Sequence, residues 1–343
     1  MDKIIHKIYE LLEFRAAQNY RISVVIVGPP GSGKSTIADE ICDKINKDYH
    51  EFLSNTSSHF ELQSGPLNVD LASNIPDISS VQLDDIKTQD GIFPSLVEDT
   101  TFQPVKNTQP KEDGSSTIII GRGGVPNAIY IEKSKTAKKS TPLPSNINIA
   151  QIVPMDGFHL SRTCLDHFED PKMAHIRRGS PSTFDSNNFA ALCSILANSS
   201  KITPEKTSFT NLFEKLSDTF YSDMPDIYIP SFDHAKKDPT VRGNLISKFT
   251  RVLIFEGLYL LYDKENWKTV YSTLTDTGAA IFLNLRVPEA TLEERVAQRH
   301  LKSGLVDTLE AGVNKFRQND LLNAREISNN TIRSELIDNI DNA

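Results

Sequence analysis

One short segment constrains the fold of this chain more than any other: a glycine-rich turn between a buried strand and a helix. Residues 22–27 read Ile-Ser-Val-Val-Ile-Val, a nearly apolar run typical of strands that are buried on both faces. The run leads directly into Gly-Pro-Pro-Gly-Ser-Gly-Lys-Ser at 28–35, which matches the pattern GxxxxGK[ST] in full. From Lys34 onward, apolar residues recur at helical spacing. Strand, turn and helix together predict a phosphate-binding loop.

The chemistry of phosphate binding requires these residue types in this order. Glycines allow successive backbone N–H groups to point inward at phosphate oxygens, and the following helix adds its free N–H groups and the positive end of its dipole. Lys34 supplies a positive charge to the β- and γ-phosphates, and the Ser35 hydroxyl is a ligand for Mg²⁺. The residues expected to contact ATP are Gly28, Pro29, Pro30, Gly31, Ser32, Gly33, Lys34, Ser35 and Thr36. The loop alone does not separate kinases from ATPases, GTPases or binding proteins.

The remaining patterning predicts an α/β fold, a P-loop NTPase with a doubly wound parallel sheet flanked by helices. An amphipathic helix is expected over 3–17, and a helical stretch follows Phe184. The C-terminal region is also expected to be helical. Further strands are expected at 147–155, 226–230, 252–255 and 280–287.

Residues 48–146 interrupt this pattern after the helix of the loop. They are rich in Ser, Asn, Asp, Pro and Thr, and a structureless connection of this length inside a compact domain is improbable. We therefore expect a core formed by 1–47 and 147–343, and a polar inserted subdomain over 48–146 that is partly mobile. Within it, 118–120 and 128–131 flank a Gly-Arg-Gly-Gly turn and could form a hairpin.

Composition narrows the cellular setting and the class of partner. The formal net charge is −8, which argues against a broad basic surface for nucleic acid or for an anionic membrane. The three cysteines are widely separated and form no CxxC pair, as suits a reducing compartment. Because no apolar run is long enough to span a bilayer and no signal sequence is evident, we expect a cytoplasmic protein.

Two acidic residues follow predicted strands and are the candidates for catalysis. Asp156 comes where the 147–155 strand should end, and a carboxylate there can accept the proton of a substrate hydroxyl; alternatively it caps the next helix. Glu256 ends another strand and is a plausible partner for Mg²⁺; alternatively it is a surface carboxylate. His159 could donate to the substrate or could be a packed structural residue.

Basic residues are needed to neutralise charge on a transferred phosphoryl group. Arg295 and Arg299 lie one helical turn apart after the last predicted strand, and could close over ATP as a lid near 295–311. Alternatively, they pair with Glu293 and Glu294 on a solvated helix face.

Seven segments together resemble the phosphoribulokinase, uridine kinase and pantothenate kinase family of P-loop kinases. Within that family, the chain is most similar to a pantothenate-kinase-like branch of fungal ATP-dependent kinases. The seven segments are GPPGSGKST, PMDGFHLSR, RRGSPSTFD, PSFDHAKKDP, FEGLYLL, RVPEATLEERVAQRH and NDLLNA, in the family's order. The resemblance covers residues 20–47 and about 147–325, and does not cover 48–145.

The resemblance implies a role for individual residues. Asp156 would be the catalytic base, Glu256 would serve Mg²⁺, and Arg295 and Arg299 would contact phosphates from the lid. The residues implied for the acceptor pocket are His159, Arg162, Arg177, Arg178, Asp233 and His234. The family uses ATP and often forms homodimers. One departure weakens pantothenate as the acceptor: where pantothenate kinases typically carry Tyr-Ser-His, this chain has Phe-Asp-His at 232–234.

The sequence therefore favours a phosphotransferase that moves the γ-phosphoryl group of ATP·Mg²⁺ to an alcohol of a small molecule, such as a pantothenate-like acid, a nucleoside or a sugar. A second hypothesis is a nucleotide-dependent regulatory NTPase that binds a protein partner through 48–146. A third is a non-catalytic protein with a vestigial loop.

Overall fold

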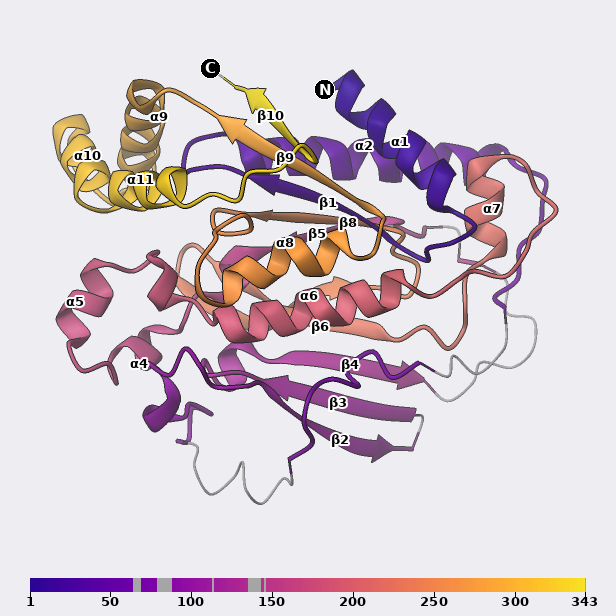
Figure 1. The fold of residues 1–343 in the computed structure, drawn as a ribbon, viewed down its shortest axis with the longest axis horizontal. Coiled ribbons are helices and arrows are strands. Elements are labelled where there is room, and N and C mark those ends of the chain that lie inside the picture. The colour runs from indigo at the N-terminus through magenta and orange to yellow at the C-terminus, as the bar shows by residue number, and fades with distance from the viewer. Residues whose placement is uncertain (64–68, 79–87, 113, 135–142, 145, 343) are drawn as a thin grey trace.

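The computed structural model describes residues 1–63, 69–78, 88–112, 114–134, 143–144 and 146–342. Within these ranges, ten strands form two five-stranded sheets, and helices cover the faces of the first sheet (Figure 1). No helix in the described ranges is both long enough and apolar enough to cross a membrane.

The first sheet is parallel and carries the phosphate loop at its centre. Its order is β10 (Ile337–Asp341), β9 (Ala280–Arg286), β1 (Ile22–Val27), β8 (Val252–Gly257) and β5 (Ala150–Pro154). Every neighbouring pair is parallel. All six residues of β1 and all six of β8 are buried, as expected for central strands with helices on both sides. The predicted parallel α/β fold is confirmed.

Helices pack on both faces of this sheet (Figure 1). On one face lie α1 (Asp2–Arg15) and α2 (Lys34–Asn55), and on the other lie α6 (Ser186–Ser200) and α8 (Lys268–Thr275). The apolar residues that predicted α1 are buried at Ile5, Ile8 and Leu12, a spacing that places them on one side of a helix. The helix of the phosphate loop runs to residue 55, beyond the expected boundary at 47.

The second sheet is antiparallel and joins the inserted region to the core. Its order is β2 (Val105–Lys111), β3 (Gly114–Ile120), β4 (Ile129–Ser134), β6 (Asp226–Asp233) and β7 (Asp238–Ile246). The expected hairpin is confirmed as β3 and β4, and β4 also pairs with β6. Our placement of 226–230 in the parallel sheet is wrong. In β6, Ile227 and Ile229 are buried while Asp226 and Tyr228 are half-buried, an alternation typical of a strand with one face on the core.

A buried arginine ties the inserted region to the core. Arg122, in the turn between β3 and β4, donates from its guanidinium to the carbonyl oxygens of Val97, Ser182 and Phe184 at 2.5–2.7 Å. Gly123 N–H donates to the buried carboxylate of Asp185, which is the N-cap of α6. That 48–146 forms a partly mobile subdomain stays a prediction.

The C-terminal part of the chain folds back over the carboxyl edge of the parallel sheet. It comprises α9 (Glu289–Lys302), α10 (Leu309–Lys315), a π-helix at Phe316–Asp320 and α11 (Leu321–Asn329), followed by β10. The expected helical region is confirmed, but β10 was not predicted. Its sequence, Ile-Asp-Asn-Ile-Asp, is short and polar because it lies at the sheet edge. The other short helices are α4 (Arg162–Leu165), α5 (Pro171–Ile176) and α7 (Leu212–Asp218).

The register of the parallel strands places the predicted acidic residues beside the phosphate loop. Glu256 pairs with Ile26 of β1 on one side and with Pro154 of β5 on the other. Because these strands run in the same direction, the loop that begins at Gly28, the turn that carries Asp156 and the carboxylate of Glu256 all lie at one edge of the sheet.

Candidate active site

The phosphate loop has the backbone shape that an anion requires. Gly31 and Gly33 adopt the left-handed conformation, with φ of 84° and 86°. A Cβ atom on Gly33 would lie 2.8 Å from Nδ2 of Asn342, so a larger residue would collide there. Gly33 is also the N-cap of α2 and makes no side-chain cap, which leaves the first N–H groups of that helix free to donate to a phosphate.

Ser35 and Glu256 together form a site that suits Mg²⁺. The Ser35 hydroxyl donates to Oε2 of Glu256 at 3.0 Å, and Glu256 is buried. Burial raises the pKa of the Glu256 carboxyl, while the nearby charge of Lys34 opposes this shift. Mg²⁺ usually takes one or two carboxylates, with the remaining ligands from phosphates and water. A hydroxyl and a carboxylate in contact beside the loop therefore fit this ion, and they would hold it there.

Asp156 lies in a turn of 3-10 helix, Met155–Phe158, that follows β5 directly. Its side chain is 41% exposed, so it is accessible to a ligand in the cavity. The backbone carbonyl of Asp156 accepts a hydrogen bond from Nδ1 of His159 at 2.8 Å. Burial lowers the pKa of His159, and the Asp156 carboxylate opposes this shift. The neutral imidazole therefore presents Nε2 as an acceptor.

A cavity of about 820 Å³ brings nine of the predicted residues together. The predicted residues that line it are Pro30, Lys34, Ser35, Asp156, His159, Arg178, His234, Glu256 and Arg299. Lys34 has no ion-pair or hydrogen-bond partner for its side chain in the part of the chain that the structure describes, and so it is available to a phosphate. The nucleotide loop, both acids and one arginine of α9 thus share one cavity.

Within the phosphate loop, the predicted residues that do not line this cavity are Gly28, Pro29, Gly31, Ser32, Gly33 and Thr36. Outside the loop, four predicted residues do not line it. Arg162 is exposed; its backbone N–H donates to Oδ1 of Asp238, and its side chain has no partner among the residues that the structure describes. Arg177 donates to the side chains of Asn319 and Asn323 and so connects α5 to the C-terminal helices. Asp233 accepts from two backbone N–H groups of its own turn.

The fourth is Arg295, which lies above the phosphate loop. Its Nη1 donates to the carbonyl of Asn342 at 3.1 Å and lies 3.5 Å from that of Gly31. The alternative that Arg295 and Arg299 pair with neighbouring glutamates is not seen, because Glu293 pairs with Arg317 through two hydrogen bonds.

Arg178 lines the cavity but is already bound within the protein. Its guanidinium donates to Oδ1 of Asp238 and to the Leu160 carbonyl, at 2.9 and 2.8 Å, and stacks on the ring of Phe232. The charge of Arg178 is therefore only partly available to a substrate. Its side chain mainly holds β7 and the ring of Phe232 in position.

The structure confirms that Phe232, in the 232–234 turn expected at the acceptor pocket, lines the cavity, and it adds residues that sequence reasoning did not assign, among them Phe184. Phe184 and Phe232 pack on the His159 ring, with centroids 4.0 and 4.7 Å away, and form an aromatic wall. Lys237 also lines the cavity, together with Asn319, Asp320 and Asn323 around the π-helix. Asn319, Asp320 and Asn323 belong to the segment NDLLNA, one of the seven that resemble the kinase family, so the sequence did mark this segment. Which of its side chains face the cavity depends on the π-helix, and hydrophobic periodicity does not reveal a π-helix.

A phosphate loop, an acid at the end of each of two neighbouring strands and a helix folded over the loop define a P-loop kinase. No family model matches the chain. It is 48% identical to the ATP-dependent kinase YFH7 of Vanderwaltozyma polyspora, over 97% of this chain and 96% of that protein. It is 49% identical to YFH7 of Saccharomyces cerevisiae, over 99% and 98%. The chain belongs to the YFH7 family of ATP-dependent kinases.

Solved structures agree with this assignment. The crystal structure of Saccharomyces cerevisiae YFH7, described as a P-loop-containing kinase with a circular permutation, matches with a TM-score of 0.88 and 49% identity, over 100% of this chain and 99% of that one. A protein from Silicibacter, described as a fructose transport system kinase, matches with a TM-score of 0.53 and 21% identity, over 98% and 97%. That likeness shows the fold alone.

Proposed function

We propose that this kinase transfers the γ-phosphoryl group of ATP·Mg²⁺ to a hydroxyl group of a small metabolite, with Asp156 as the general base. The observation that carries the proposal is the position of Asp156 and Glu256. They lie at the ends of neighbouring strands, level with the phosphate loop, and both line the cavity that contains Lys34 and Ser35. One acid can then serve the acceptor and the other the metal.

Each residue has one task in this reaction. Asp156 takes the proton of the acceptor hydroxyl while the acceptor oxygen forms a bond to the γ-phosphorus. The bond from that phosphorus to the bridging oxygen breaks, and its electron pair stays on ADP. Lys34 and Arg299 stabilise the negative charge on the transferred group, and Arg295 closes over the loop. Ser35 and Glu256 would hold Mg²⁺, which would neutralise charge on the β- and γ-phosphates.

The cavity walls support a small acceptor with a flat or apolar part. His159, Phe184 and Phe232 provide stacked rings, and His234 and Lys237 supply positive charge or hydrogen bonds nearby. Arg177 and Arg178 are held by asparagine and aspartate side chains, so recognition of an acidic group would fall mainly to Lys237 and His234. Pantothenate-like acids, nucleosides and sugars are all compatible with this arrangement.

The substitution Asp156→Asn tests the proposal. It should leave thermal stabilisation by ATP·Mg²⁺ largely intact, because the loop is untouched, and should lower ADP release by about 10²–10⁴-fold. The substrate is found first, by screening hydroxyl metabolites for stimulation of ADP release by the purified protein. Asp276→Asn is the matched control, since Asp276 is exposed at the end of α8 and should keep full turnover.

Two results would contradict the proposal. Full turnover in Asp156→Asn would remove Asp156 from the reaction. ADP release that ignores every hydroxyl compound and rises with a protein partner would favour the regulatory NTPase.

A further inference from the structure

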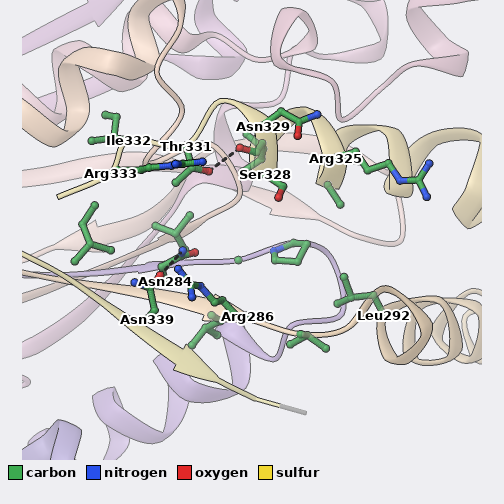
Figure 2. Close-up of a pocket in the computed structure, with 18 of the residues that line it drawn as sticks. Asn284, Arg286, Leu292, Arg325, Ser328, Asn329, Thr331, Ile332, Arg333 and Asn339 are labelled. Atoms are coloured by element: carbon green, nitrogen blue, oxygen red, sulfur yellow. Dashed lines mark hydrogen bonds between the residues drawn. The ribbon is translucent and has the colours of Figure 1, made fainter. Parts of the chain in front are cut away.

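A second cavity lies on the other side of the phosphate loop. It measures about 860 Å³ and lies between the end of β9 and the segment 328–334, which comprises the end of α11 and most of its connection to β10 (Figure 2). Gly28 and Pro29 line this cavity, whereas the next residue, Pro30, lines the active-site cavity. Lys34 and Ser35 line only the active-site cavity. The start of the loop therefore forms part of the wall of a second cavity, separate from the one that Lys34 and Ser35 line.

Two arginines of this cavity have no partner for their charge within the described ranges of the chain. Arg286 on β9 and Arg333 on the 328–334 segment lie on opposite walls (Figure 2). Neither guanidinium has an ion pair or a hydrogen bond among the residues that the structure describes. A third arginine, Arg325, is bound by both carboxylate oxygens of Glu289 at 2.9 and 3.0 Å. The cavity thus keeps two uncompensated positive charges in a protein whose net charge is −8.

The rest of the lining combines polar and apolar groups. The side-chain amides of Asn284 and Asn339 bond to each other at 3.0 Å, beside Arg286 (Figure 2). Ser328 and Asn329 contribute side chains that have no hydrogen-bond partner among the described residues. Leu292, Ile327 and Ile337, all buried, form an apolar part of the wall. A few convergent polar groups over an apolar wall, in a volume within about 300–1,000 Å³, are typical of small-molecule sites.

We propose that this cavity binds a small organic anion. A phosphate or carboxylate group lies between Arg286 and Arg333, where the guanidinium groups donate charge-assisted hydrogen bonds. The apolar part of the ligand packs against Leu292 and Ile337. Because Leu292 belongs to α9, the helix whose Arg299 lines the active-site cavity, the ligand contacts an element that both cavities share.

Calorimetric titration with phenyl phosphate and with benzoate tests this site. The non-hydrolysable nucleotide AMP-PNP and Mg²⁺ are added first, so that the phosphate loop is filled before either anion is titrated. Binding of AMP-PNP is recorded in the same experiment, and its absence would count against the proposed kinase reaction rather than against this cavity. Benzamide, similar in shape but neutral, measures the apolar contribution alone.

Arg286→Met and Arg333→Met should each weaken binding of the anion about tenfold or more, because each removes a charge-assisted contact. Both residues are exposed, so neither change endangers folding. Arg325→Met is the matched control in the same cavity and should leave the affinity within about twofold. The better of the two anions identifies the charged group that the site prefers.

Three outcomes would overturn the proposal. They are no saturable binding of either anion at millimolar concentration, equal binding by benzamide, and affinities that do not respond to Arg286→Met and Arg333→Met. A parallel titration is made without AMP-PNP, and anion binding that is seen there but is lost with AMP-PNP would likewise overturn the proposal, since the cavity would then belong to the nucleotide site.

Discussion

Gly157→Ala places a single methyl group where the turn that carries Asp156 touches β6. A Cβ atom at this position would lie 2.1 Å from the carbonyl oxygen of Pro230 and 2.7 Å from its carbonyl carbon. Ordinary van der Waals contact begins near 3.4 Å, so the distance is roughly 1.3 Å too short. The obstructing atoms belong to the backbone of β6, which pairs with β7 on both sides of the register shift at Pro230 and with β4 at residues 226–228, so β6 resists displacement. The turn at residues 155–158 must therefore move instead.

The size of this displacement sets the expected effect. Overpacking of this kind costs about 1–3 kcal/mol of unfolding free energy. If Asp156 is the base, as proposed, a shift of about 1 Å in its carboxylate costs about 100-fold in turnover. The phosphate loop is unchanged, so ATP·Mg²⁺ should still raise the melting temperature. Urea unfolding measures the first quantity, ADP release with the acceptor found by screening measures the second, and thermal unfolding with ATP·Mg²⁺ measures the third.

Gly278→Ala is the control for changing a glycine as such. Gly278 adopts a left-handed conformation, with φ of 64°, in the turn after α8, and a Cβ atom there would meet only the tip of the Arg15 side chain. We expect a stability loss of about 1–2 kcal/mol with normal turnover. Wild-type stability and turnover in Gly157→Ala would refute the claim that contact with β6 positions Asp156.

Two further predictions concern buried groups. Arg122→Met should lower the unfolding free energy, measured in urea, by about 3–5 kcal/mol, because three carbonyl oxygens lose a buried cation. Arg242→Met, at a partly exposed ion pair, is the control and should cost less than about 1 kcal/mol. Similar losses in the two variants would contradict this prediction. Burial lowers the pKa of folded His159 below its usual 6.5, so the unfolded chain gains a proton first as the pH falls. The stability advantage of wild type over His159→Gln should therefore be present above about pH 6.5 and should shrink below it. Urea unfolding at several pH values measures this difference. A difference that does not change with pH would disprove the lowered pKa of His159.

The position of the catalytic edge could be predicted from local sequence. A phosphate loop needs glycines at fixed spacing, and a parallel strand buried on both faces reads as a continuous apolar run, so β1, β5 and β8 could be found approximately. Parallel strands then bring their carboxyl ends together, which predicted that Asp156 and Glu256 lie near the loop.

Local patterns did not predict the pairing of β6 or the presence of β10. A strand of alternating burial such as β6 fits either sheet, and its partner β4 lies almost 100 positions earlier in the chain. The polar run at 337–341 becomes a strand only because β9 offers a free edge. Both depend on contacts between segments that are distant in sequence.

The sequence by itself determined the class of chemistry, because glycine spacing, a lysine and acids after apolar runs are local requirements of phosphoryl transfer. Only the tertiary structure decided which charges are free to act. Arg177 and Arg178 look like substrate residues in sequence, yet asparagine and aspartate side chains bind them. In the part of the chain that the structure describes, Arg286 and Arg333 have no side-chain partner beside their cavity. The physical reason is that the availability of a charge depends on which residues the fold places within hydrogen-bond distance, and residue type does not reveal that.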